Sequence, residues 1–299
     1  MQLSRRAKGL LITLTGVSLL IPDALSIRLA GLDSWSVVFW RSLLGGLVVM
    51  LVVLLTRRHE GPLKALHLSR LGMLLVALIC TANIGFVMAM HHTKAANVLI
   101  ILALSPMFSA LFDRLLFQLR LATRTWIAIF SCLIGVIILV IDGLDAGTQM
   151  GNLIALGTAL LMGLEFSLMG QVQQRQIWPA LSLAYLLSAV IAAFMVPSLS
   201  LQGANIPIVL AMGLLIVPFS FMLICLGPGY IPAPEVAIML LLETVMGPLL
   251  VWWVLGEDPG RYALLGGAIV VTTLICHAIT DLLQDRRERR ASLNKGSTG

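Results

Sequence analysis

Two stretches of the sequence, far apart in the chain, carry the same pattern. Residues 9–26 read GLLITLTGVSLLIPDALS, and residues 151–168 read GNLIALGTALLMGLEFSL. When the first is placed over the second, Gly9 aligns with Gly151 and Asp23 aligns with Glu165. Both stretches are otherwise almost wholly apolar, and about 20 apolar residues are enough for a helix to cross the hydrocarbon core of a membrane. The pattern predicts two membrane-spanning helices, each with a carboxylate at the same position.

The composition extends this interpretation to the rest of the chain. Of its 299 residues, 59% are hydrophobic and 11% are charged, whereas a soluble domain has about 25% charged residues. The mean hydropathy is +0.99. These values exclude a soluble enzyme, a disordered protein and a nucleic-acid-binding module, despite the net charge of +6. They predict an all-α polytopic membrane protein.

Apolar runs long enough to span a membrane follow one another with short loops between them. We expect ten transmembrane helices, over residues 8–29, 33–56, 69–92, 94–116, 122–141, 150–173, 179–197, 205–227, 231–255 and 260–283. The positive-inside rule then sets their orientation. With both termini in the cytoplasm, all but four of the 20 basic residues lie on the inner side; Arg28, Lys94 and Arg261 lie outside, and Arg41 lies within a span.

The two matching stretches begin the two halves of the chain. We divide it into residues 1–145 and 146–285, with five spans each, and a basic cytoplasmic tail over residues 286–299. Because five is odd, the second half must cross the membrane in the opposite direction to the first. Inverted repeats are typical of alternating-access transporters, which hold substrate near the membrane midplane where the repeats meet. The alternative is a chance similarity between two apolar segments.

Several short motifs follow one another along the chain, some in the first half and others in the second. The first half contains Phe39-Trp40-Arg41 and residues 103–108, ALSPMF; the second contains residues 241–244, LLET, residues 247–250, GPLL, and Leu255-Gly256-Glu257. This order resembles the drug/metabolite transporter superfamily and, within it, the EamA-type ten-helix exporters. The resemblance implies an exporter in the bacterial inner membrane, for amino acids, aromatic or hydrophobic ones included, or for drugs, as in exporters of the YddG type. It also makes Ser105 a candidate substrate-binding residue.

Asp23 and Arg41 are the first two ionisable candidates for a site within the membrane. Counted from the turn between the first two spans, at 1.5 Å per residue, both lie roughly 10–12 Å below the outer surface. We therefore expect an ion pair, which offsets part of the cost of burying two charges. The pair either only locks two helices together or also binds the two ends of a zwitterion. Pro22 precedes Asp23 and is expected to kink the first span beside it.

Three further polar residues lie deep in the predicted spans. Glu165 and Glu243 are near the middle of their helices, where apolar surroundings favour a protonated carboxyl. Each is a candidate for proton coupling or for binding an ammonium group, or else is a hydrogen-bonded tie between helices. Asn83 needs hydrogen-bond partners in hydrocarbon, so it faces either neighbouring helices or a substrate amide or carboxylate.

Prolines inside the spans complete the candidate set. We expect Pro106, Pro218 and Pro248, like Pro22, to break their helices and to line or gate a transport path. Methionines and phenylalanines nearby suit an amphipathic solute. The expected partners are a small-molecule substrate, the lipid bilayer and a coupling proton, without cofactor, metal or nucleic acid, in a monomer or weak dimer. A lipid-linked metabolite flippase or another metabolite carrier of the superfamily is the alternative; an integral-membrane enzyme would need a clustered nucleophile or metal triad, and no such motif is present.

Overall fold

The computed structural model describes residues 5–59, 61–118, 123–142, 149–196, 199–227, 230–231 and 233–296. Within these ranges the secondary structure is entirely helical, as the composition predicts. The elements in chain order are α1 (Arg5–Leu20), α2 (Asp23–Leu29), α3 (Ser34–Thr56), α4 (Pro62–Ala65), α5 (Arg70–His92), α6 (Ala95–Leu102), α7 (Ser105–Phe117), α8 (Thr123–Asp142), α9 (Gln149–Met169), α10 (Gln174–Met195), α11 (Ile206–Ala211), the π-helical turn η1 (Met212–Ile216), α12 (Val217–Leu226), α13 (Ala233–Leu255) and α14 (Arg261–Gly296).

Seven helical segments among the described residues are long and apolar enough to cross a membrane. They are Ala7–Leu29, Ser34–Thr56, Arg70–His92, Ala95–Phe117, Gln149–Met169, Gln174–Met195 and Ile206–Leu226. Three shorter apolar helices, Trp126–Ile138, Leu242–Leu255 and Arg261–Cys276, fall inside the other three predicted spans. The chain is therefore a multi-pass membrane protein, and the count of ten spans stays a prediction.

Two of these segments are built from helices that break in mid-course. α1 ends at Leu20, and Pro22 is the N-cap of α2, which starts at Asp23. The predicted kink at Pro22 is thus confirmed. The second break lies at Ala103-Leu104, just before α7 starts at Ser105, and not at Pro106 itself. Pro106 occupies the first turn of α7, where the N–H that proline lacks would have had no partner within the helix.

The remaining two prolines disturb their helices less. Pro218 lies in the first turn of α12, and α12 directly follows the π-helical turn η1. The regular pattern of α-helical hydrogen bonds is therefore interrupted just before the proline, which lacks a backbone N–H. α13 continues through Pro248 to Leu255 without ending. One proline removes only one backbone hydrogen bond, so a helix held by its neighbours can continue past it.

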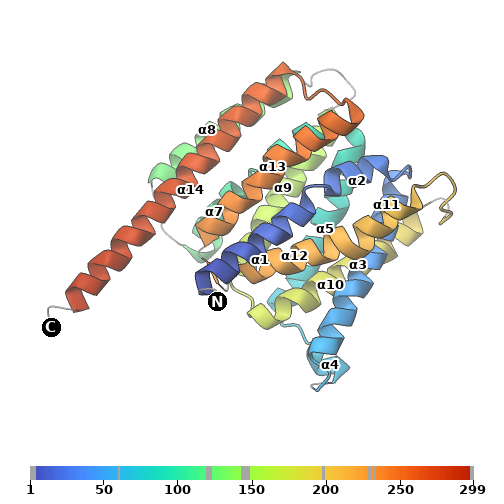
Figure 1. Cartoon of the computed structure of the whole chain (residues 1–299), viewed down its shortest axis with the longest axis horizontal. Helices are drawn as coiled ribbons and strands as arrows, with labels where there is room; N and C mark the ends of the chain where they lie inside the picture. Colours follow the sequence, from blue (N-terminus) through green and yellow to red (C-terminus); the bar gives the residue numbers. More distant parts are fainter. Residues whose placement is uncertain are drawn as a thin grey trace.

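The helices pack in a bundle with α8 and α14 side by side at one edge (Figure 1). The most extensive pairings join α3 to α10, α5 to α9, α8 to α14, α7 to α9 and α1 to α12. Glycines allow some of these close approaches: a Cβ at Gly46 of α3 would lie 2.9 Å from Leu186 of α10. The outer surface keeps large apolar side chains exposed, such as Phe194 and Trp253, as expected of a surface that contacts lipid.

Candidate functional site

An ion pair lies buried at the break between α1 and α2. Nη2 of Arg41, on α3, donates to Oδ2 of Asp23 at 2.8 Å, and its Nε donates to Oδ1 at 3.3 Å. Both side chains are 2% exposed. The predicted pair is therefore confirmed, with the forked geometry that makes arginine–carboxylate contacts strong. Between the two residues the chain turns, and the Asp33 side chain caps the start of α3 by accepting the backbone N–H groups of Trp35 and Ser36.

Asn83 completes the coordination of the guanidinium. Its side-chain oxygen accepts a hydrogen bond from Nη1 of Arg41, and its Nδ2 donates to Oγ of Ser42 at 2.8 Å. Phe86, also on α5, lies with its ring 5.6 Å from the guanidinium carbon, within the range of a cation–π contact. We call Asp23, Arg41, Ser42 and Asn83 the central cluster.

Residues from the second half of the chain surround the central cluster. Tyr185 of α10 and Glu243 of α13 both lie within electrostatic range of Arg41. The Tyr185 side chain is buried and packs edge-to-face against Phe221, with ring centroids 6.3 Å apart. Glu165 of α9 is buried and interacts electrostatically with Tyr185. The charged centre is thus built from helices of both halves.

The predicted residues do not all meet at this centre. Asp23 and Asn83 both bond to Arg41. Glu243 lies within electrostatic range of Asp23 and Arg41, whereas Glu165 lies within range of Tyr185. Oγ of Ser105, by contrast, donates to the carbonyl of Leu102 at 2.7 Å and so stabilises the break between α6 and α7. The placements leave the roles of these residues in binding or coupling as predictions.

Sequence reasoning did not single out Ser42, Trp40 or Tyr185 as site residues. Ser42 follows Arg41 directly, but a serine in an apolar helix more often bonds its own backbone. Tyr185 offers a detectable signal, because it is one of only three tyrosines and lies inside an apolar run. Nε1 of Trp40 is buried with no hydrogen-bond partner among the described residues, and an unsatisfied buried donor is costly unless a ligand or water pairs with it.

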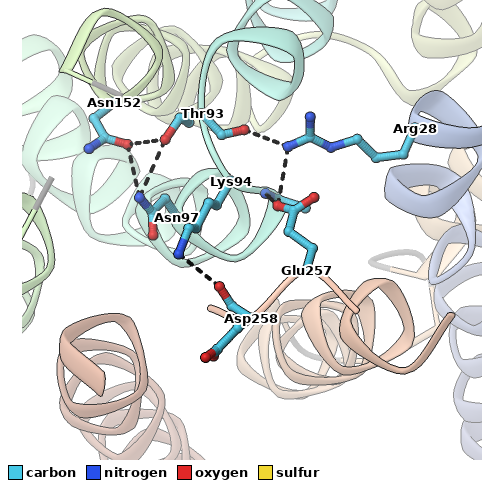
Figure 2. A network of polar contacts seen from close by, with 8 residues as sticks. Arg28, Thr93, Lys94, Asn97, Asn152, Glu257 and Asp258 are labelled. Atoms are coloured by element: carbon cyan, nitrogen blue, oxygen red, sulfur yellow. Dashed lines mark hydrogen bonds and ion pairs between the residues drawn. The ribbon is translucent and has the colours of Figure 1, made fainter. Parts of the chain in front are cut away.

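A second polar network, at one end of the bundle, joins four segments of the chain: α2, the α5–α6 connection, α9 and the α13–α14 connection (Figure 2). Nη2 of Arg28, in the last turn of α2, donates to the carbonyl of Thr93 at 2.5 Å and lies 3.3 Å from Oε1 of Glu257. The same Glu257 oxygen accepts the backbone N–H of Ala95 at 2.8 Å. Nζ of Lys94 donates to the carbonyl of Asp258 at 2.8 Å.

The first residues of α9 extend this network. Oγ1 of Thr93 donates to Oδ1 of Asn152 at 2.8 Å, and Nδ2 of Asn97 lies 3.3 Å from both oxygens (Figure 2). We call Arg28, Thr93, Lys94, Asn97, Asn152, Glu257 and Asp258 the latch cluster. It ties α2, the α5–α6 connection, α9 and the α13–α14 connection together, and two of its three contacts to the α13–α14 connection involve one side chain, Glu257.

Comparison with known proteins agrees with this architecture. Residues 10–141, less than half of the chain, match the EamA-like transporter family, and this similarity points to a transporter. A solved crystal structure, described only as that of a protein, superposes with a TM-score of 0.65 at 19% sequence identity over 94% of this chain and 98% of the other. At that identity the likeness shows a shared fold. No protein of the curated set matches the chain.

Proposed function

We propose that this protein is a secondary transporter that exports amino acids or amphipathic metabolites across the bacterial inner membrane by alternating access. The observation that carries the proposal is the central cluster. A fully buried arginine, paired with a carboxylate at a helix break and surrounded by side chains from both halves, is the arrangement expected of a midplane substrate site.

The packing of the helices supports the proposed inverted repeats. In these repeats α9 corresponds to α1 and α2, α10 to α3, α12 to α5, α13 to α6 and α7, and α14 to α8. When each helix is exchanged for its counterpart, the α5–α9 contact becomes the α12–α1 contact, and the α7–α9 contact becomes the contact of α13 with α1 and α2. The α3–α10 and α8–α14 contacts exchange into themselves. This two-fold pattern is what repeats over 1–145 and 146–285 would produce. The proposed location of both termini in the cytoplasm rests on the distribution of basic residues.

The chemistry of the central cluster suits a zwitterion. When the Asp23–Arg41 pair separates, the guanidinium can bind a carboxylate in a bidentate manner, and the Asp23 carboxylate can bind an ammonium group. Nε1 of Trp40 offers a further donor close by in the sequence. The apolar solute portion would contact Phe86 and Phe221, which lie beside Arg41 and Tyr185.

The latch cluster supports the alternating-access part of the proposal. The Arg28 and Glu257 side chains, which join the two halves of the chain, are each 23% exposed, and ion pairs that water reaches are individually weak. A few weak bonds between the two halves can hold one end closed and still break during each transport cycle. In the proposed orientation this end faces the periplasm.

Transport into proteoliposomes tests the function directly. We would measure uptake of labelled amino acids, sugars and a lipid-linked sugar by the wild-type protein and by Asp23→Asn, with Asp258→Asn as a matched control that removes a carboxylate outside the membrane. The proposal expects uptake of a zwitterionic or amphipathic solute that is lost in Asp23→Asn and kept in Asp258→Asn. Movement of the lipid-linked sugar alone would instead identify a flippase.

A further inference from the structure

Four basic side chains surround one cavity at the connection between α3 and α4. His59, Lys64, His67 and Arg175 line a space of about 380 Å³. The first three come from the segment between α3 and α5, and Arg175 comes from the first turn of α10. No carboxylate lines this space among the described residues. We call these four residues the basic bowl.

Hydrogen bonds hold the walls of the basic bowl in place. Arg57 donates to the carbonyl of Ala65 at 3.1 Å and also to the carbonyl of Arg175, so it links the α3–α5 segment to the start of α10. Oε1 of the buried Gln176 accepts from both the backbone N–H and Oγ of Ser69, at 3.0 and 2.9 Å. The bowl therefore exists before any ligand enters it, which lowers the entropic cost of binding.

The polar groups of the bowl are donors. Nε2 of His59 lies 3.3 Å from Nε of Arg58; because an arginine nitrogen can only donate, that ring nitrogen accepts and Nδ1 carries the proton. Lysine and arginine side chains have no acceptor. A cavity that offers several donors and positive charge is suited to a phosphate group, whose oxygens only accept when ionised.

An apolar track along α3 leads to the basic bowl. Leu47, Leu51 and Leu55 follow one another at spacing four, on one face of the helix, and are 50%, 57% and 62% exposed. The last of them, Leu55, is the residue directly before Thr56, at which α3 ends. An acyl chain along this track would bring its headgroup to the connection that carries His59.

We propose that the basic bowl binds the phosphate of an anionic phospholipid whose acyl chain lies along Leu47, Leu51 and Leu55 of α3. The leucine track distinguishes a lipid from a soluble phosphate, since a soluble ligand has no use for it. The proposal needs neither the transport function nor the orientation of the chain, because it concerns only the bowl and the adjoining helix.

Lipid binding to the full-length protein in a neutral detergent tests this proposal. We would titrate phosphatidylglycerol and follow the unfolding temperature and the lipid adducts in native mass spectra, for wild type and for Lys64→Gln/Arg175→Gln. Lys8→Gln/Arg114→Gln is the matched control, with the same loss of charge at exposed residues outside the bowl. Loss of one contact to a charged group weakens binding by about tenfold, so we expect at least that loss in the bowl variant and no change in the control.

Two comparisons make the result decisive. Phosphatidylcholine, which has the same phosphate but no net charge, should bind more weakly than phosphatidylglycerol, and glycerol 3-phosphate should not reproduce the lipid's effect. An equal effect of glycerol 3-phosphate would overturn the lipid assignment, as would equal weakening in bowl and control variants. If the double variant does not fold, Lys64→Glu provides the same test with a single exposed side chain, and undiminished phosphatidylglycerol binding to it would also overturn the proposal.

Discussion

Nη2 of Arg28 and Oε1 of Glu257 lie 3.3 Å apart, although the two residues are separated by most of the chain. The carboxylate also accepts the backbone N–H of Ala95, so one side chain connects the α13–α14 connection to both α2 and α6. The remaining bonds of the latch cluster do not involve the Glu257 carboxylate. It is therefore the single group whose change should loosen this end of the bundle most.

Glu257→Gln should open the latch cluster. The neutral amide keeps the shape of the side chain but removes the charge that faces Arg28, and charged hydrogen bonds are about twice as strong as neutral ones. We expect faster hydrogen exchange in the backbone of residues 93–98, measured by mass spectrometry. Asp258→Asn is the matched control, because among the described residues the Asp258 side chain accepts only from the N–H of Gly260, and Lys94 bonds the Asp258 backbone carbonyl. Equal exchange in the two variants would remove Glu257 from the latch.

The topology prediction concerns the inverted repeat. Reporter fusions at Glu60, Arg120 and Arg290 should give cytoplasmic signals, and fusions at Asp145 and Gln202 should give periplasmic ones. Basic residues are concentrated in the segments placed inside, which is the physical basis of the expectation. A cytoplasmic signal at Asp145 would mean that the two halves run in the same direction.

Asp33 should contribute to stability in a pH-dependent manner. Partial burial raises its pKa, but hydrogen bonds from the Ser36 hydroxyl and from the backbone N–H groups of Ser36 and Trp35 outweigh it, so the pKa lies below the ordinary value of 3.8. The ionised side chain thus stabilises the fold at any pH above that ordinary value, and this contribution disappears as the pH falls through the lower pKa of the folded state.

Substitution of Asp33 measures that contribution. Asp33→Ala removes the N-cap of α3 and should lower the free energy of unfolding by about 1 kcal/mol near neutral pH. Thermal unfolding in detergent should show the difference from wild type shrinking below pH 3.8. Asp33→Asn keeps a good N-cap without a charge, so its small effect should not vary with pH. A pH-independent effect of Asp33→Ala would assign the cap to shape alone.

The sequence was sufficient to predict an all-helical membrane protein and the Asp23–Arg41 pair for a simple reason. Hydrophobic length defines a membrane span, and residue counting from a tight turn gives depth, so two opposite charges at equal depth on adjacent helices must meet. The partners of Arg41 beyond Asp23 depend on which helices become neighbours. Tyr185 and Glu243 lie within electrostatic range of it because α10 packs against α3 and α13 packs against α2, which carries Asp23. Sequence alone does not give the order of helices in a bundle.

Residue patterns also did not predict the exact position of a helix break or the hydrogen bonds made by backbone carbonyls. The break at Ala103-Leu104 lies before Pro106 because a proline is best accommodated in the first turn of a new helix. The latch cluster depends on backbone carbonyls of Thr93 and Asp258, which every residue carries and which no sequence motif distinguishes. The residues of the basic bowl cannot be told apart in the sequence from other basic residues of cytoplasmic segments, which the positive-inside rule already explains.

A double-mutant cycle should show that Asp23 and Arg41 depend on each other. Asp23→Asn or Arg41→Gln alone leaves a charge buried without its partner, which costs about 3–5 kcal/mol. The double variant removes both charges and should be less destabilised than the sum of the two, as measured by unfolding in detergent and by transport. Strict additivity would contradict an energetic coupling between the residues. Arg41→Lys separates the charge from the forked geometry, and we expect it to restore only part of the loss.

The final prediction concerns the coupling of transport to protons. Glu165 lies near Tyr185 and Cys225, whereas Glu243 lies near Asp23 and Arg41, and among the described residues no direct electrostatic interaction joins the two carboxyls. We therefore expect facilitated transport that follows the substrate gradient alone. Liposomes with an imposed pH step and equal substrate on both sides provide the measurement, and accumulation above equilibrium would refute facilitation. In that event, Glu165→Gln and Glu243→Gln, which imitate the protonated carboxyl, would identify the coupling residue as the one whose substitution abolishes accumulation while substrate exchange persists.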